Sequence, residues 1–77
     1  MILNLDEIIN LKNQLAETFG ITLHLHDACG SQSFSFDMPV SEEIQNFISD
    51  YLKPLGGTAQ FSQSGTRFIV QKSTLDN

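Results

Sequence analysis

The residues best suited to chemistry lie in one short stretch, His24–Cys29, which reads His-Leu-His-Asp-Ala-Cys. Imidazole and thiolate bind zinc or copper, and histidines two positions apart on a strand share a face. A closed structural site needs four ligands, and the 77 residues contain no further cysteine or histidine. The pattern therefore has two interpretations. His24, His26 and Cys29 form a metal site that a second copy of the protein completes, or the two imidazoles are surface groups that bond to Ser33 and Ser35.

Patterns for catalysis are weaker. A Cys29 nucleophile would need an orienting third group and an oxyanion site, and the sequence shows no motif for either. Glu42 and Glu43 are adjacent on an expected helix, where side chains diverge by about 100°, so they are better explained as helix N-terminal charge than as a carboxylate pair. No glycine-rich phosphate loop is present. We therefore expect a protein without enzymatic activity and without a cofactor.

The histidines belong to an expected β-hairpin over residues 21–38, in which both arms alternate strictly. The expected apolar face carries Ile21, Leu23, Leu25, Phe34, Phe36 and Met38. With a turn at Cys29-Gly30, Leu25 pairs with Phe34. The same register sets His24 beside Ser35 and His26 beside Ser33. A slip of one residue would invert both faces, so the register is well specified.

An amphipathic helix is expected on each side of this hairpin. Asn4 and Glu7 form an N-terminal capping pattern, and Gly20 is suited to end the first helix. The first buried stripe is Ile8, Leu11, Leu15 and Phe19, supported by Leu5 and Ala16. Ser41 caps the second helix, whose stripe is Ile44, Phe47, Ile48, Tyr51 and Leu52. Pro54 disfavours helical geometry at Lys53, and Gly56-Gly57 supplies the exit.

A second hairpin follows, with a turn at Ser64-Gly65 that pairs Phe61 with Phe68 and Ala59 with Val70. The chain then reads as one domain over residues 1–77, with a first αββ unit at about 4–38, a second at about 41–72 and a short tail at 73–77. Neither unit can bury its apolar face alone. The expected fold is α+β: a four-stranded antiparallel sheet with both helices on one face. The pattern leaves the strand order open.

The other face of that sheet would be open. Alternation assigns to it Thr22, His24, His26, Ser33, Ser35, Asp37, Thr58, Gln60, Ser62, Arg67, Ile69 and Gln71. Six of the nine acidic residues fall on the helices, so the molecule should be acidic on its helical side. Such a face is either solvated or an interface. We take His24, His26, Ser33, Ser35, Arg67 and Ile69 as its candidate binding residues.

The hairpin sequence around Asp27-Ala28-Cys29-Gly30 resembles the signature of the RDAC family, short bacterial proteins named after Arg-Asp-Ala-Cys. His26 stands at the arginine position, which removes a fixed cation from any anion contact there. The resemblance implies a compact intracellular protein of bacterial or phage origin, and it implies no activity.

Two functions remain open. The first is a small acidic binding protein, a regulator or inhibitor, that docks on a partner protein or on itself. The second is a small-ligand or metal module built on His24, His26, Cys29 and Arg67. A net charge of −5 argues against general nucleic-acid binding. The single cysteine fits a reducing compartment, and the sequence contains no membrane-length apolar run or signal peptide, so we expect a cytoplasmic protein.

Overall fold

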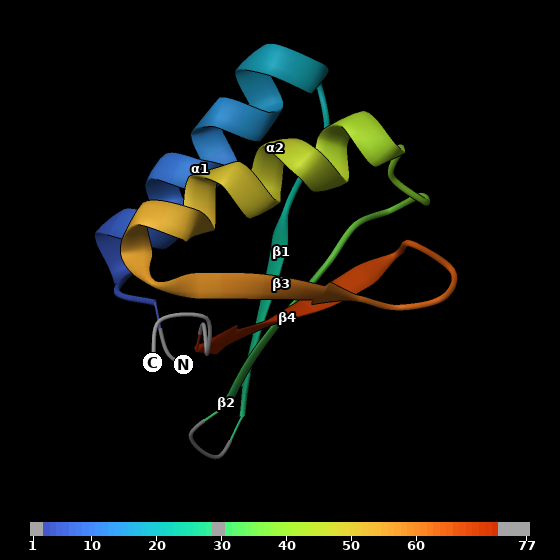
Figure 1. Ribbon diagram of the computed structural model, residues 1–77. Coiled ribbons are helices and arrows are strands. Elements are labelled where there is room, and N and C mark those ends of the chain that lie inside the picture. Colours follow the sequence, from blue (N-terminus) through green and yellow to red (C-terminus); the bar gives the residue numbers. More distant parts are fainter. Residues whose placement is uncertain (1–2, 29–30, 73–77) are drawn as a thin grey trace.

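The computed structural model describes residues 3–28 and 31–72 (Figure 1). Along the chain these residues form α1 (Leu5–Phe19), β1 (His24–Ala28), β2 (Ser31–Ser35), α2 (Glu42–Leu52), the short 3₁₀ helix η1 (Lys53–Leu55), β3 (Gly57–Phe61) and β4 (Arg67–Lys72). The expected turn at Cys29-Gly30 and the tail at 73–77 lie outside the described residues.

α1 begins and ends as its sequence predicts. The Asn4 side chain accepts a hydrogen bond from the Glu7 N–H at 2.8 Å, and the Glu7 side chain accepts one from the Asn4 N–H at 3.0 Å. Gly20 follows the last turn with φ of 71°, a left-handed conformation that glycine adopts without a Cβ penalty. Both ends of the helix are therefore fixed locally.

α2 has the expected cap but a different end. The Ser41 hydroxyl accepts from the Ile44 N–H at 3.4 Å. The expectation that Pro54 would keep Lys53 out of helical geometry is wrong, because Lys53 has φ −55° and ψ −51° and begins η1. Pro54 needs no N–H donor in the first turn of this new helix, so the chain tightens before it leaves at Gly56.

Both hairpins have the predicted register. β1 and β2 pair His24 with Ser35, Leu25 with Phe34, and His26 with Ser33. β3 and β4 pair Ala59 with Val70 and Phe61 with Phe68. Local alternation was sufficient to set these pairings.

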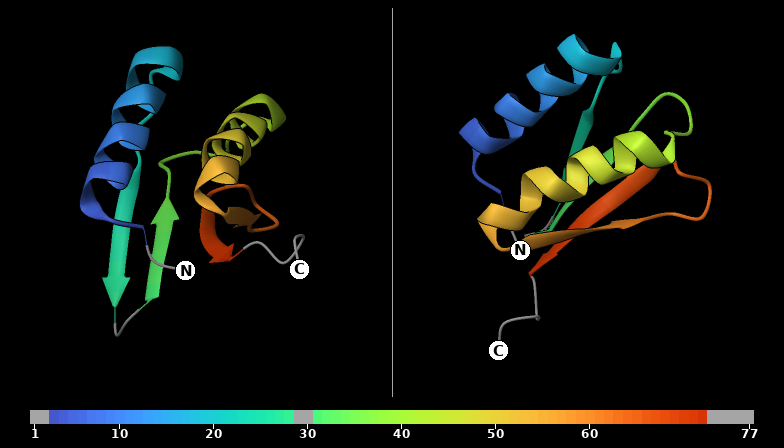
Figure 2. Two further views of the ribbon diagram at one scale, coloured as in Figure 1. Left: turned by 60° about the vertical axis from the view of Figure 1, so that its left-hand side comes forward. Right: turned by 45° about the horizontal axis from the view of Figure 1, so that its top comes forward.

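The two hairpins join through β2 and β4, which gives the antiparallel sheet the order β1-β2-β4-β3. The join pairs Phe34 with Phe68, Ser33 with Ile69, and Ser35 with Arg67. α1 and α2 lie side by side on one face of this sheet, and the opposite face is left uncovered (Figures 1 and 2). The α+β fold, with two helices on one face of a four-stranded antiparallel sheet, is confirmed.

The core lies between the helices and the sheet. Its buried residues are Leu3, Ile8, Leu11, Leu15, Leu23, Phe34, Phe36, Val40, Ile48, Leu52, Phe68 and Val70. Phe68 is the centre of its aromatic part, with ring centroids 4.9 Å from Phe34, 5.8 Å from Phe36 and 5.1 Å from Phe61. The join between the hairpins therefore lies within the aromatic part of the core.

Four side chains expected in the core are exposed. Leu5 and Ala16 lie on the exposed flank of α1 rather than in its buried stripe, and Leu5 is 65% exposed. Leu25 is 39% exposed because β1 is an edge strand and has a neighbour on one side only. Met38 is 60% exposed, since the strand ends at Ser35 and the alternation no longer applies there.

Two polar side chains tie the layers together. The amide of Gln32 accepts from the Leu3 N–H at 3.0 Å and donates to the Leu3 carbonyl at 3.2 Å, so β2 holds the segment that precedes α1. The Tyr51 hydroxyl of α2 donates to the Glu7 carbonyl of α1 at 2.9 Å. Neither long-range contact is visible from sequence spacing. In the part of the chain that the structure describes, neither helix has the length and apolar character needed to cross a bilayer.

Candidate binding face

The uncovered side of the sheet, which we call the open face, carries two rows of side chains that run across the strands. The first row is His26, Ser33, Ile69 and Gln60, one residue from each of β1, β2, β4 and β3. The second is His24, Ser35 and Arg67 from β1, β2 and β4. Neighbouring strands in a sheet lie about 4.8 Å apart, so side chains in one row are near neighbours. The fold brings all six candidate binding residues from the sequence onto this one surface.

The two histidines are each engaged in a contact on the open face. His24 Nε2 lies 3.0 Å from Asp37 Oδ1, and His26 Nε2 lies 2.7 Å from the hydroxyl oxygen of Ser35. His26 therefore bonds diagonally to Ser35, although Ser33 is its direct partner in the register. The His24–Asp37 pair is well exposed, and exposed ion pairs contribute little to stability.

These contacts bear on the metal hypothesis. Within residues 3–28 and 31–72, no three histidine, cysteine, aspartate or glutamate side chains gather as a metal site requires. The two histidines also direct their Nε2 atoms at different partners, Asp37 and Ser35. The third candidate ligand, Cys29, lies outside the described residues. The metal site stays a prediction.

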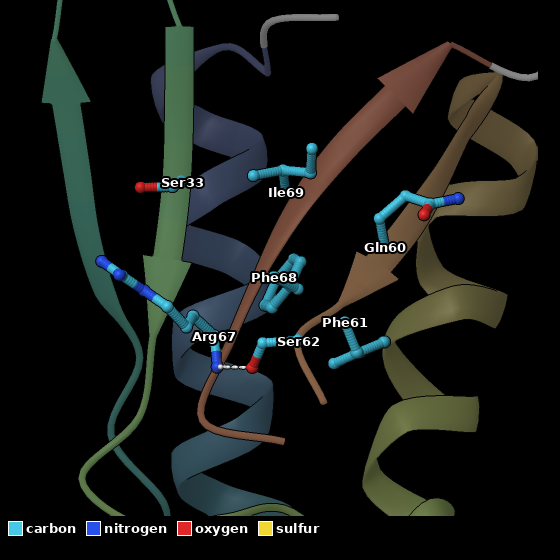
Figure 3. A pocket seen from close by; sticks show the side chains of 7 residues that line it. All are labelled: Ser33, Gln60, Phe61, Ser62, Arg67, Phe68 and Ile69. Carbon is cyan, nitrogen blue, oxygen red and sulfur yellow. Dashed lines mark hydrogen bonds between the residues drawn. The ribbon is translucent and has the colours of Figure 1, made fainter. Parts of the chain in front are cut away.

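Part of these two rows lines a hollow in the open face. A cavity of about 370 Å³ is lined by Ser33, Gln60, Phe61, Ser62, Arg67, Phe68 and Ile69 (Figure 3). Ile69 is 42% exposed, which makes it an apolar group within a rim of hydroxyl and amide side chains. The hollow thus combines a small apolar surface with polar edges, the composition typical of a binding site.

Arg67 lies at one side of the hollow. Its main chain is held by Ser62, whose hydroxyl accepts from the Arg67 N–H at 3.3 Å and whose N–H donates to the Arg67 carbonyl at 2.9 Å. Its side chain extends from β4 across β2 toward β1 in Figure 3. Among the described side chains, no acid or hydrogen-bond acceptor lies within bonding distance of the guanidinium. The backbone of Arg67 is thus fixed, and its charge is available.

Charge is distributed unequally between the two sides of the molecule. α1 and α2 together carry Asp6, Glu7, Glu17, Glu42, Glu43 and Asp50. Lys12 is the one basic residue on these two helices. The open face has Arg67, two imidazoles and the carboxylate of Asp37, which contacts His24. Six acidic residues therefore lie on the helices, and a neutral to weakly basic sheet side stays a prediction.

A second hollow lies on the helical side. Its volume is about 440 Å³, and its lining is Asp6, Glu7, Asn10, Tyr51, Pro54 and Leu55. The Tyr51 hydroxyl there donates to the Glu7 carbonyl and accepts from the Asn10 amide at 3.3 Å. These bonds connect α1 to α2, so Tyr51 and Asn10 have a structural role in this hollow.

Comparisons of the chain with family models, with curated proteins and with solved structures gave no match. The fold defines the class of the protein as α+β, with its helices on one face of the sheet and the other face open. The resemblance of its first hairpin to RDAC proteins stays a prediction.

The sequence placed Gln60 and Ser62 on the open face but did not single them out as site residues. Their role depends on the strand order, because only the β2–β4 join brings Ser33 of the first hairpin beside Ile69 and Gln60 of the second. The available signal was the pairing of Gln60 with Ile69 that the Phe61–Phe68 register of the second hairpin implies. That signal indicated a common face and gave no indication of a hollow.

Proposed function

We propose that this protein is a small, non-enzymatic binding protein, a regulator or inhibitor that docks on a partner protein through its open face. The observation that carries the proposal is the hollow beside Arg67, where a half-exposed Ile69 lies near a guanidinium that has no acidic partner among the described side chains, on an uncovered sheet. Antiparallel sheets often have one solvated face, and most of its side chains are then small and polar. Burial of this isoleucine against a partner would remove apolar surface from water and so favour binding.

The size and charge distribution support the same class of function. The open face carries an exposed isoleucine beside a cation, whereas α1 and α2 carry six acidic residues and one lysine. We further propose the cytoplasm as the compartment, on the argument that a single cysteine suits a reducing environment. The resemblance to RDAC proteins supports a bacterial or phage origin.

The test is capture of a partner from cells of the source organism with three forms of the intact protein. The first form is the wild type, and the second carries Ser33→Ala, Ser35→Ala and Arg67→Ala on the open face. The third is a control with Asn13→Ala and Asn46→Ala, both exposed on the helices. Circular dichroism establishes that all three forms fold, and sedimentation velocity shows whether the partner is a second copy.

We expect the wild type and the helix control to retain the same partner, identified by mass spectrometry, and the open-face variant to lose it. Equal capture by the open-face variant, or loss of the partner by the helix control alone, would contradict the proposal.

The ligand or metal alternative has its own check. Elemental analysis and thermal melts with and without zinc should show neither bound metal nor a change in melting temperature if the histidines serve only as surface groups. A stabilisation by zinc that disappears in a His24→Ala, His26→Ala variant would favour the alternative.

A further inference from the structure

The hollow and Arg67 together indicate which chemical groups a partner must present to bind the open face. We propose that it binds an extended acidic segment of a partner protein, with one carboxylate on the Arg67 guanidinium and an apolar side chain against Ile69 in the hollow. This inference rests on the proposed function and adds the chemistry of the partner.

The first argument is charge. Arg67 is exposed, and the described side chains leave its guanidinium without an anionic partner. Asp37, the acidic residue assigned to this face, is engaged with His24 at 3.0 Å. A planar guanidinium matches a carboxylate through two parallel N–H···O bonds. The site therefore has a cation that an incoming carboxylate can pair with directly.

The second argument concerns the remaining acids. Those of α1 and α2 belong to the helices on the other side of the sheet (Figure 2), and the buried core lies between these helices and the sheet. Salt at physiological concentration screens charges beyond about 8 Å, so the helical acids repel an acidic segment on the open face only weakly. A partner with phosphates would instead require several cations in a row, and the face offers one arginine.

The third argument is spacing. Arg67 and Ile69 are two positions apart on β4, which corresponds to about 7 Å along a strand. The arginine side chain extends sideways across β2, so its guanidinium lies to one side of β4 (Figure 3). An extended partner segment spans this distance with two or three residues, so its acidic and apolar side chains should be that far apart in sequence.

The rim of the hollow completes the fit. Ser33, Gln60 and Ser62 present hydroxyl and amide groups around Ile69. The Ser33 hydroxyl and the Gln60 amide can bond to the backbone of a segment that crosses the face, whereas the Ser62 hydroxyl is engaged with the Arg67 N–H and with Ser64. A volume of about 370 Å³ accommodates an apolar side chain of the size of leucine or phenylalanine. The apolar contact supplies affinity, and the carboxylate supplies orientation.

The experiment is a titration of the ¹⁵N-labelled intact protein, followed by NMR, with three capped peptides of about seven residues. In the first, aspartate and leucine stand two positions apart in a serine and glycine background. In the second, asparagine replaces the aspartate, and in the third lysine replaces it. Arg67→Gln and Ile69→Ser variants are titrated in the same way. Both positions are exposed, so both variants should keep the fold, which their spectra report directly.

We expect the aspartate peptide to shift the amide signals of Ser33, Gln60 and Ile69 and to bind about threefold more tightly than the asparagine peptide, as an exposed ion pair allows. Arg67→Gln should remove this difference between the two peptides. Ile69→Ser should weaken both peptides alike. The lysine peptide should bind least.

Equal binding of the aspartate and asparagine peptides, stronger binding of the lysine peptide, or shifts confined to the helices would overturn the inference. Absence of any shift up to roughly 5 mM peptide, where even millimolar affinity is visible, would overturn it as well. If in addition the open-face variant loses the captured partner while Arg67→Gln alone retains it, the proposed function stands and only the acidic segment is wrong.

Discussion

Phe68 is the buried side chain at the centre of the aromatic cluster, so its replacement should cost this protein a large part of its stability. It is 2% exposed, and its ring stacks on Phe34 and Phe36 and packs against Phe61. It also pairs with Phe34 across the join between the two hairpins. We therefore consider the variant Phe68→Leu, which keeps an apolar side chain but removes the ring.

The magnitude follows from these contacts. Each aromatic pair stabilises the fold by about 0.5–1.5 kcal/mol in addition to the hydrophobic contribution of its buried area. Three such pairs are lost here, although their contributions do not simply add. Leucine leaves part of the ring volume unfilled, and a void in a packed core adds to the cost. We expect the free energy of unfolding to fall by about 2–3 kcal/mol. A protein of this size has a free energy of unfolding of roughly 4–12 kcal/mol, so the expected loss is a large fraction of its stability.

The assay is urea unfolding at 25 °C, followed by far-ultraviolet circular dichroism. Phe61→Leu is the matched control, because Phe61 is only partly buried and makes one of the aromatic contacts. It should cost about 1 kcal/mol. In thermal melts, Phe68→Leu should lower the midpoint by roughly 10–20 °C. If the two variants lose the same free energy, Phe68 is not the centre of the core and the packing argument fails.

Three further predictions concern positions outside the aromatic cluster. Replacing both His24 and His26 by alanine should change the free energy of unfolding by less than about 0.5 kcal/mol in a urea titration, because both side chains are exposed. A large loss of stability would mean that these side chains lie beneath the helices. Tyr51→Phe removes the donor to the Glu7 carbonyl and should cost about 1 kcal/mol by the same titration, and an unchanged value would show that this bond between the helices does not contribute. Gly20→Ala adds a Cβ to a residue in the left-handed conformation and should lower the free energy of unfolding by about 1 kcal/mol, although no neighbouring atom lies near the new Cβ. An unchanged free energy of unfolding would indicate that α1 ends differently.

The features that the sequence predicted correctly are those set by neighbouring residues. The capping of α1 by Asn4 and Glu7 depends on a spacing of three residues, and the pairing of Leu25 with Phe34 depends on two alternating arms. Alternation also placed Arg67 and Ile69 on the open face, where they are exposed. Each of these features can be worked out from a short window of the chain.

The features that the sequence did not predict depend on contacts between distant parts of the chain. The β2–β4 join is one of several ways to combine two hairpins, and alternation does not distinguish among them. The exposure of Leu25 follows from the edge position that this order gives to β1. The hollow needs the same join, because Ser33 reaches Ile69 only when β2 lies beside β4.

The most direct test of the central claim, that the open face is the docking surface, is site-specific photo-crosslinking. A photoreactive amino acid replaces Gln60, which lines the hollow, or Asn46, an exposed amide on α2, in otherwise identical protein. With the partner present, the probe at Gln60 should form a covalent product on irradiation and the probe at Asn46 should form little. Efficient crosslinking from Asn46, with none from Gln60, would contradict the account.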